Sequence, residues 1–181
     1  MSTAAPSVNG GILAYEFEEI FTEHYQLIYR TAYAVTGRRQ DAEDVLQTIF
    51  LRLLQREVTP DLKTNPKKYL YRAAVNAALN TVRNRKRERL TDGVDRLDIA
   101  ARDPETREVE ENQRNLVEAI SQLSPQVVEI LILRYEHDYS DAQIARMLGK
   151  SRGVIAVTLY RARARLRKLL SAPQEIGNDT P

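Results

Sequence analysis

The chain has 181 residues, 43% hydrophobic and 29% charged, a composition that suits one globular domain or two small ones. It contains no cysteine, which excludes disulfides and thiolate metal sites. Its two histidines, His24 and His137, are too scattered for a metal site and are expected on helix surfaces. Neither a signal peptide nor an apolar run of membrane-spanning length is present, so we expect a cytoplasmic location and no membrane insertion.

Charge is arranged in blocks along the chain, although the net charge is only +2. Residues 63–89 hold nine basic side chains against Glu88 alone, and residues 150–170 contain no acid. Between them, residues 92–111 carry eight acidic and three basic side chains. Two basic blocks separated by an acidic one can bind a polyanion at two places while the net charge stays near zero.

Two helices are predicted at the start of the chain, after residues 1–14, which are small, polar and expected to be disordered. The first covers residues 15–36 and ends at Gly37. The second covers residues 39–55, and its apolar set is wider than one buried stripe needs. It is either a buried bundle helix or one that also meets a partner.

A third helix is predicted over residues 65–89, after a polar loop at 56–64 that contains Pro60. Asn65 caps it and Pro66 takes the first helical position. Small residues on one side permit close packing. The other side carries aromatic, amide and basic groups: Lys68, Tyr69, Tyr71, Arg72, Asn76, Asn80 and Arg83. Such a face suits stacking on and hydrogen bonding to exposed bases, or it is a solvated face with tyrosines lying over the bundle.

Residues 90–108 show no sustained period, contain Gly93 and Pro104, and are expected to form a flexible acidic linker. A helix at 109–123 then begins a second domain. Ser124 and Pro125 are the expected cap and first position of the next helix, 126–136, whose apolar run is nearly all buried. The tail, residues 172–181, is polar.

Residues 140–170 have the pattern of a helix-turn-helix. Ser140 and Gln143 can form a capping box, and Gly149 stands where a left-handed C-terminal residue is expected. Ser151 then caps a helix with one apolar stripe and basic residues on both flanks, which suits the phosphate walls of a DNA groove. The alternative is a solvated basic helix end, which the helix dipole also favours.

The expected fold class is all-α, with an N-terminal helical bundle and a C-terminal helix-turn-helix domain joined by the linker. No strand-length alternation and no catalytic constellation stands out. Asp41, Glu43 and Asp44 crowd a helix N-terminus, where acids are favoured without any active site. We therefore predict a protein that is not an enzyme and needs no cofactor.

Four stretches, taken in order, resemble the extracytoplasmic-function (group 4) sigma factors, promoter-specificity subunits of bacterial RNA polymerase. They are DAEDVLQTIFLRLL at 41–54, NPKKYLYRAAVNAALNTVRNRKR at 65–87, LSPQVVEILILRYEHDYSDAQIARMLGKS at 123–151 and GVIAVTLYRARARLR at 153–167. The resemblance implies that residues 15–89 bind core polymerase and recognise the minus-ten element. It likewise implies that residues 109–171 recognise the minus-thirty-five element.

The resemblance also implies roles for individual residues. Residues 41–54 would dock on the clamp of the largest polymerase subunit through Asp41, Asp44, Gln47, Phe50 and Leu51. Asn76 would read an extruded base, and loop 57–64 would pocket a flipped one. The minus-ten contacts would come from Tyr69, Arg72, Asn76, Asn80, Arg83, Arg85, Lys86 and Arg87. The minus-thirty-five contacts would come from Ser151, Arg152, Val157, Thr158, Arg161 and Arg165.

One departure bears on the second site. Family recognition helices usually carry Lys, Ser and Arg where this chain has Ala156, Val157 and Thr158. We expect Val157 and Thr158 to contact thymine methyls and minus-thirty-five recognition to be weak or unusual. The expected partners are core RNA polymerase, promoter DNA and, by family practice alone, an anti-sigma factor. The alternatives are a stand-alone helix-turn-helix regulator and a helical adaptor.

Overall fold

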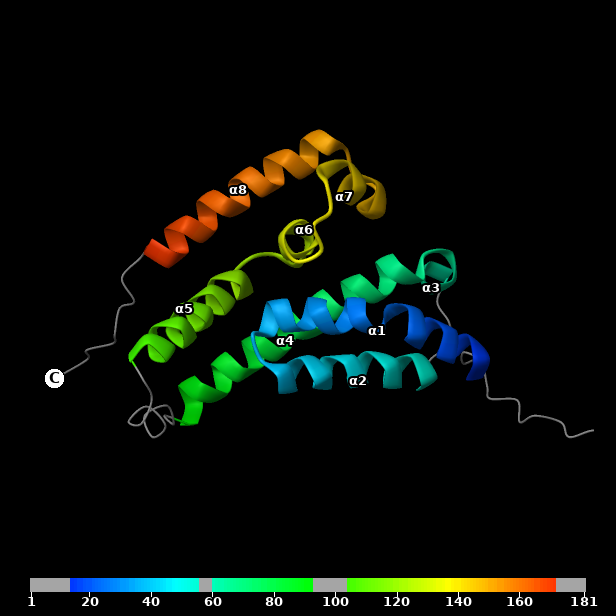
Figure 1. Cartoon of the computed structure of the whole chain (residues 1–181), viewed down its shortest axis with the longest axis horizontal. Helices are drawn as coiled ribbons and strands as arrows, with labels where there is room; N and C mark the ends of the chain where they lie inside the picture. The colour runs from blue at the N-terminus through cyan, green and yellow to red at the C-terminus, as the bar shows by residue number, and fades with distance from the viewer. Residues whose placement is uncertain (1–13, 56–59, 93–103, 172–181) are drawn as a thin grey trace, which may run out of the picture. The chain divides into compact units, whose positions relative to one another are not determined.

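The computed structural model describes residues 14–55, 60–92 and 104–171 (Figure 1). These residues form eight α-helices and no strand, which confirms the all-α class. Contacts divide the chain into two compact units, Met1–Thr81 and Val82–Pro181. None of the helices in the described ranges combines the length and hydropathy that a bilayer crossing requires. The predicted disordered N-terminus, the middle of the linker and the polar tail lie outside the described residues.

The first unit begins with an antiparallel pair of helices, α1 (Ala14–Thr36) and α2 (Arg39–Gln55), which pack against each other (Figure 1). Gly37 takes a left-handed conformation, φ 67°, and thereby ends α1 as predicted. The Thr36 hydroxyl donates to the Ala32 carbonyl at 2.9 Å and secures the same corner. The buried apolar residues of the pair are Ile28, Ala32, Val35, Ala42, Val45, Ile49, Phe50 and Leu53.

The next two helices both begin at a proline. Residues 60–64, predicted as loop, form the one-turn helix α3 (Pro60–Thr64), because proline is well placed at a first helical position and Leu62 is only 3% exposed. The Thr64 hydroxyl closes the turn on the Pro60 carbonyl at 2.8 Å. Helix α4 (Pro66–Asp92) then starts as predicted, with the Asn65 side-chain oxygen accepting from the Lys68 amide at 3.0 Å.

Three aromatic side chains differ from the prediction. Tyr71, expected on the outer face of α4, is fully buried with Leu70, Ala74 and Val75, because it lies on the apolar side of the helix. His24, expected on a helix surface, is 4% exposed. His137, also expected on a helix surface, is half-buried in the turn after α6.

The second unit contains α5 (Pro104–Ser121), α6 (Pro125–Tyr135), α7 (Asp141–Leu148) and α8 (Arg152–Ser171). Helix α5 begins five residues before the predicted start, because Pro104 opens the helix rather than breaking it. Helix α8 packs on α5, α6 and α7. The core lies among Val128, Ile130, Leu133, Ile144, Leu148, Ile155, Leu159 and Ala162.

Candidate nucleic-acid and partner interfaces

The outward face of α4 presents a stripe of amides and guanidinium groups. Asn76, Asn80, Arg83 and Arg87 are all exposed, and their spacing of three or four residues places them on one side of the helix. Ala74 and Ala78 are fully buried on the packed side. Amide and guanidinium groups on one exposed helix face can hydrogen-bond to bases and to phosphates. We call this set the α4 stripe.

The other residues predicted for the same site are less open. Tyr69, Arg72 and Arg85 are half-buried, and Arg72 and Arg85 take part in other interactions of the structure. Lys86 is exposed. The α4 stripe therefore offers its two amides, Asn76 and Asn80, most freely, and the half-buried Tyr69 precedes the stripe on the same helix.

Within the second unit, the last turns of α4 make contacts that the sequence prediction missed. Arg83 donates three hydrogen bonds to the end of α5: its Nε and Nη2 reach the Ser121 carbonyl at 3.2 and 3.1 Å, and Nη2 reaches the Leu123 carbonyl at 3.2 Å. A guanidinium group is well suited to carbonyls that a helix end leaves unpaired. Lys86 forms an ion pair with Glu118. Both side chains therefore have partners inside the protein.

A second exposed stripe runs along α2. Asp44, Gln47, Leu51 and Leu54 recur at spacings of three and four residues, and all are exposed, Leu51 by 54% and Leu54 by 43%. We call this set the α2 stripe. The wide apolar set noted in the sequence is thus divided: one side is core, and the other leaves two leucines to solvent. Leu54 was missed as a site residue, although its spacing from Leu51 indicates it.

Phe50 does not belong to the α2 stripe. Its side chain is only 5% exposed, and its ring meets Phe21 and Phe17 edge-on, with centroids 4.7 and 5.7 Å apart. This burial corrects the expectation that the Phe50 ring is available to a partner. Asp41 is half-buried at the start of α2 and has interactions of its own.

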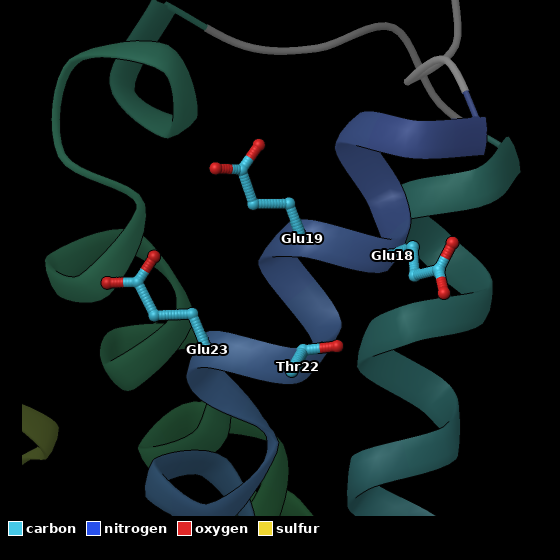
Figure 2. Close-up of a pocket in the computed structure, with 4 residues that line it drawn as sticks. All are labelled: Glu18, Glu19, Thr22 and Glu23. Carbon is cyan, nitrogen blue, oxygen red and sulfur yellow. The ribbon is translucent and has the colours of Figure 1, made fainter.

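The N-terminal half of α1 is acidic. Glu18, Glu19 and Glu23 surround a shallow hollow with Thr22, and Figure 2 shows the carboxylates of Glu19 and Glu23 extended toward one side of the helix and that of Glu18 toward the other. No cluster of side chains suited to a metal ion occurs among the described residues. Three carboxylates on this half of α1 repel phosphate, so this part of the helix is unsuited to nucleic acid.

His24 is a buried titratable group on α1. Burial lowers its pKa from the ordinary value of 6.5; the Glu23 carboxylate opposes this shift and the Lys67 ammonium adds to it. The imidazole is therefore favoured in its neutral form. We assign it a role in packing.

The helix-turn-helix is built as the sequence predicts. The Ser140 hydroxyl accepts from the Gln143 amide at 3.3 Å, and the Gln143 side chain accepts from the Ser140 amide at 2.8 Å, which completes the capping box. Gly149 adopts φ 68° and ends α7. The Ser151 hydroxyl accepts from the Val154 amide at 3.3 Å and caps α8. By contrast, Ser124 stands at the start of α6 without a side-chain cap.

The predicted recognition residues differ in how freely α8 presents them. Arg152, Val157, Arg161 and Arg165 are exposed. Thr158 is half-buried, and its hydroxyl donates to the Val154 carbonyl at 2.7 Å, so it is occupied within the helix. The sequence prediction missed Tyr160, which is 74% exposed and stands three residues after Val157 on the outward face.

Comparisons with known proteins show the family to which the chain belongs. Two sigma-70 family models match the chain, Sigma-70 region 2 over residues 20–88 and Sigma-70, region 4 over residues 113–166. The RNA polymerase sigma-E factor of Streptomyces coelicolor is 31% identical over 157 residues, which cover 87% of each chain. The chain belongs to the extracytoplasmic-function (group 4) sigma factors. This sigma factor is a protein of transcription initiation, and its family is not generally enzymatic.

Two other known proteins are similar to this chain. The ECF RNA polymerase sigma factor SigE of Mycolicibacterium smegmatis is 29% identical over 161 residues, covering 86% of this sigma factor and 62% of the relative, so less than two thirds of that relative is spanned. A solved structure of the sigma factor RpoE in complex with the anti-sigma factor NepR from Bartonella quintana is 20% identical, with a TM-score of 0.48, and the match covers 89% of this chain and 100% of that one. The region 2 match contains the α2 stripe and almost all of α4, and the region 4 match contains α7 and most of α8.

Proposed function

We propose that this sigma factor binds core RNA polymerase through its N-terminal region, residues 15–89, and opens promoters there. The α2 stripe supplies the docking surface for the clamp of the largest subunit. Leu51 and Leu54 provide apolar contact, and Asp44 and Gln47 provide polar contacts that fix the register. An exposed apolar pair flanked by polar groups is typical of a protein-binding surface.

The α4 stripe is the proposed minus-ten site. Asn76 hydrogen-bonds to an extruded non-template base and Asn80 lies one turn further along the same face. Flipping a base costs a few kcal/mol of unstacking, which polymerase binding and phosphate contacts offset. Arg87 contacts the DNA backbone. Arg83 and Lys86 contact it with the hydrogen-bond donors that their partners within the protein leave open. The single observation that carries this proposal is the exposed row of amides beside guanidinium groups on α4.

The C-terminal region, residues 109–171, is the proposed minus-thirty-five module. Helix α8 enters the major groove by its N-terminal half, where Arg152 and Arg161 contact phosphates and Val157 contacts thymine methyl groups. The exposed ring of Tyr160 lies beside them. The proposed location is the cytoplasm, without enzymatic activity or cofactor. An anti-sigma factor is included among the partners on the family resemblance alone.

The test is reconstitution with core polymerase. Tagged full-length protein should co-purify with core RNA polymerase and direct run-off transcription from fragments of the source genome. Leu51→Ala combined with Leu54→Ala should reduce co-purification, whereas Val109→Ala, which trims an apolar side chain 64% exposed on α5, should not. Tight binding to duplex DNA without any association with polymerase would overturn the proposal and favour a stand-alone regulator.

A further inference from the structure

An arginine on α8 is held by an aromatic side chain from another helix. Arg163 is exposed, and its Nε donates a hydrogen bond to the hydroxyl of Tyr135, the last residue of α6. The guanidinium carbon lies 5.6 Å from the centre of the Tyr135 ring, within the range of a cation–π contact. Tyr135 itself is 56% exposed, so the pair stands at the surface of the second unit.

The contact leaves the binding end of Arg163 available. Its Nε is occupied by Tyr135, and it makes no other hydrogen bond or ion pair with residues that the structure describes. The two terminal NH₂ groups thus form an open fork of the kind that binds phosphate in two-pronged fashion. Because one side-chain nitrogen is already fixed, less conformational entropy is lost when the fork closes on an anion.

Its position on α8 indicates which anion. At roughly 100° per residue, Arg163 and Arg167 lie on one flank of the helix, and Arg161 and Arg165 lie on the other. A recognition helix in a major groove has a phosphate backbone on each side. The sequence predicts that basic residues on both flanks suit the phosphate walls of a groove, and it names Arg152 on the first flank and Arg161 and Arg165 on the second. It gives Arg163 no contact of its own.

We propose that Arg163 binds a DNA backbone phosphate on the flank opposite Arg161, and that Tyr135 is the residue that positions it. This inference rests on the proposed DNA-binding role of α8 and extends it to a residue from outside the helix-turn-helix. The contact is to phosphate, so it is independent of DNA sequence.

The experiment measures how tightly the full chain binds a fluorescent random-sequence 25-base-pair duplex, by fluorescence anisotropy. The measurement is repeated over a series of KCl concentrations, because the salt dependence of the affinity reports how many phosphates the protein neutralises. Each neutralised phosphate contributes about 0.9 to the slope of log K against log salt. Arg163→Gln should lower that slope by about 0.9 and weaken binding on the order of fivefold to tenfold near 0.1 M salt. Arg114→Gln, which removes one exposed charge from α5, is the matched control and should change neither quantity appreciably.

Tyr135→Phe separates positioning from packing, because it keeps the ring and removes the hydrogen-bond acceptor. It should weaken binding about twofold to fivefold with the slope unchanged, and it should have no further effect in the Arg163→Gln background. A purely structural role would instead give equal losses in both backgrounds.

Two results would overturn the inference while the proposed function stands. In the first, Arg163→Gln would bind DNA as tightly as the control Arg114→Gln. In the second, Arg163→Gln would reduce co-purification with core polymerase but would leave DNA binding unchanged. The second would place a protein, not DNA, at this pair. If the unsubstituted chain shows no salt-dependent binding to the duplex, the proposed DNA-binding role of α8 fails as well.

Discussion

Phe50 and its neighbour Leu51 give the sharpest test of how α2 divides between core and partner surface. Truncating Phe50, which is 5% exposed, removes its edge-on contacts with Phe17 and Phe21, each worth ~0.5–1.5 kcal/mol beyond area burial. It also leaves a cavity. We therefore expect Phe50→Ala to lower the free energy of unfolding of the first unit by about 3–5 kcal/mol, a large share of the ~5–15 kcal/mol typical of a domain.

Leu51→Ala is the matched change one residue away. Because Leu51 is 54% exposed, its truncation should alter stability by no more than about 0.5 kcal/mol while weakening association with core polymerase. Phe50→Leu, which keeps much of the volume, should retain most of the stability and all of the polymerase binding.

Urea unfolding followed by far-UV circular dichroism measures stability, and co-purification with core polymerase measures binding. An unchanged urea midpoint for Phe50→Ala would show that the ring is not core. Equal stability losses for Phe50→Ala and Leu51→Ala would contradict the division of α2 into a buried and an exposed side.

Three further outcomes are expected. Gly149→Ala should lower the free energy of unfolding by about 1–2 kcal/mol, because φ 68° suits glycine. Gly153→Ala, at a helical position with open space around it, should raise that free energy by up to ~1 kcal/mol. Thermal unfolding measures both changes, and the same sign for both would contradict this reasoning. Asn76→Ala should impair permanganate-detected promoter opening and spare polymerase binding, and equal loss of both would contradict base reading. Because burial lowers the pKa of His24, the unfolded chain binds that proton more readily, so stability present above pH ~6.5 is lost on acidification; His24→Gln should lose less stability between pH 7 and pH 5 than the unsubstituted chain.

Local signals in the sequence predicted most of the fold. The capping box at Ser140, the left-handed Gly149 and the cap at Asn65 each depend on residues within four positions, so the sequence displays them directly. Prolines were harder to interpret. Pro60 and Pro104 each open a helix, although both were assigned to loops, because the same ring ends one helix and suits the first turn of another.

The site was less predictable, because exposure depends on packing between helices distant in sequence. Periodicity marks α2 as apolar on more than one side, but only the aromatic neighbours from α1 show that Phe50 belongs to the core and Leu51 does not. The contact of Arg163 with Tyr135 spans 28 residues and leaves no local pattern. The burial of Tyr71 has the same origin: its ring follows the packed side of α4, which the sequence did not distinguish from the polar side.

The contact of Arg83 with the end of α5 affects how genetic results at this position should be interpreted. A substitution there removes three hydrogen bonds to the Ser121 and Leu123 carbonyls before any promoter is present. A defective phenotype of Arg83→Ala would therefore combine two causes that a reporter assay does not separate. Arg87, whose side chain donates to Asn84 of its own helix, is the cleaner position for asking what a positive charge on α4 contributes to transcription in living cells.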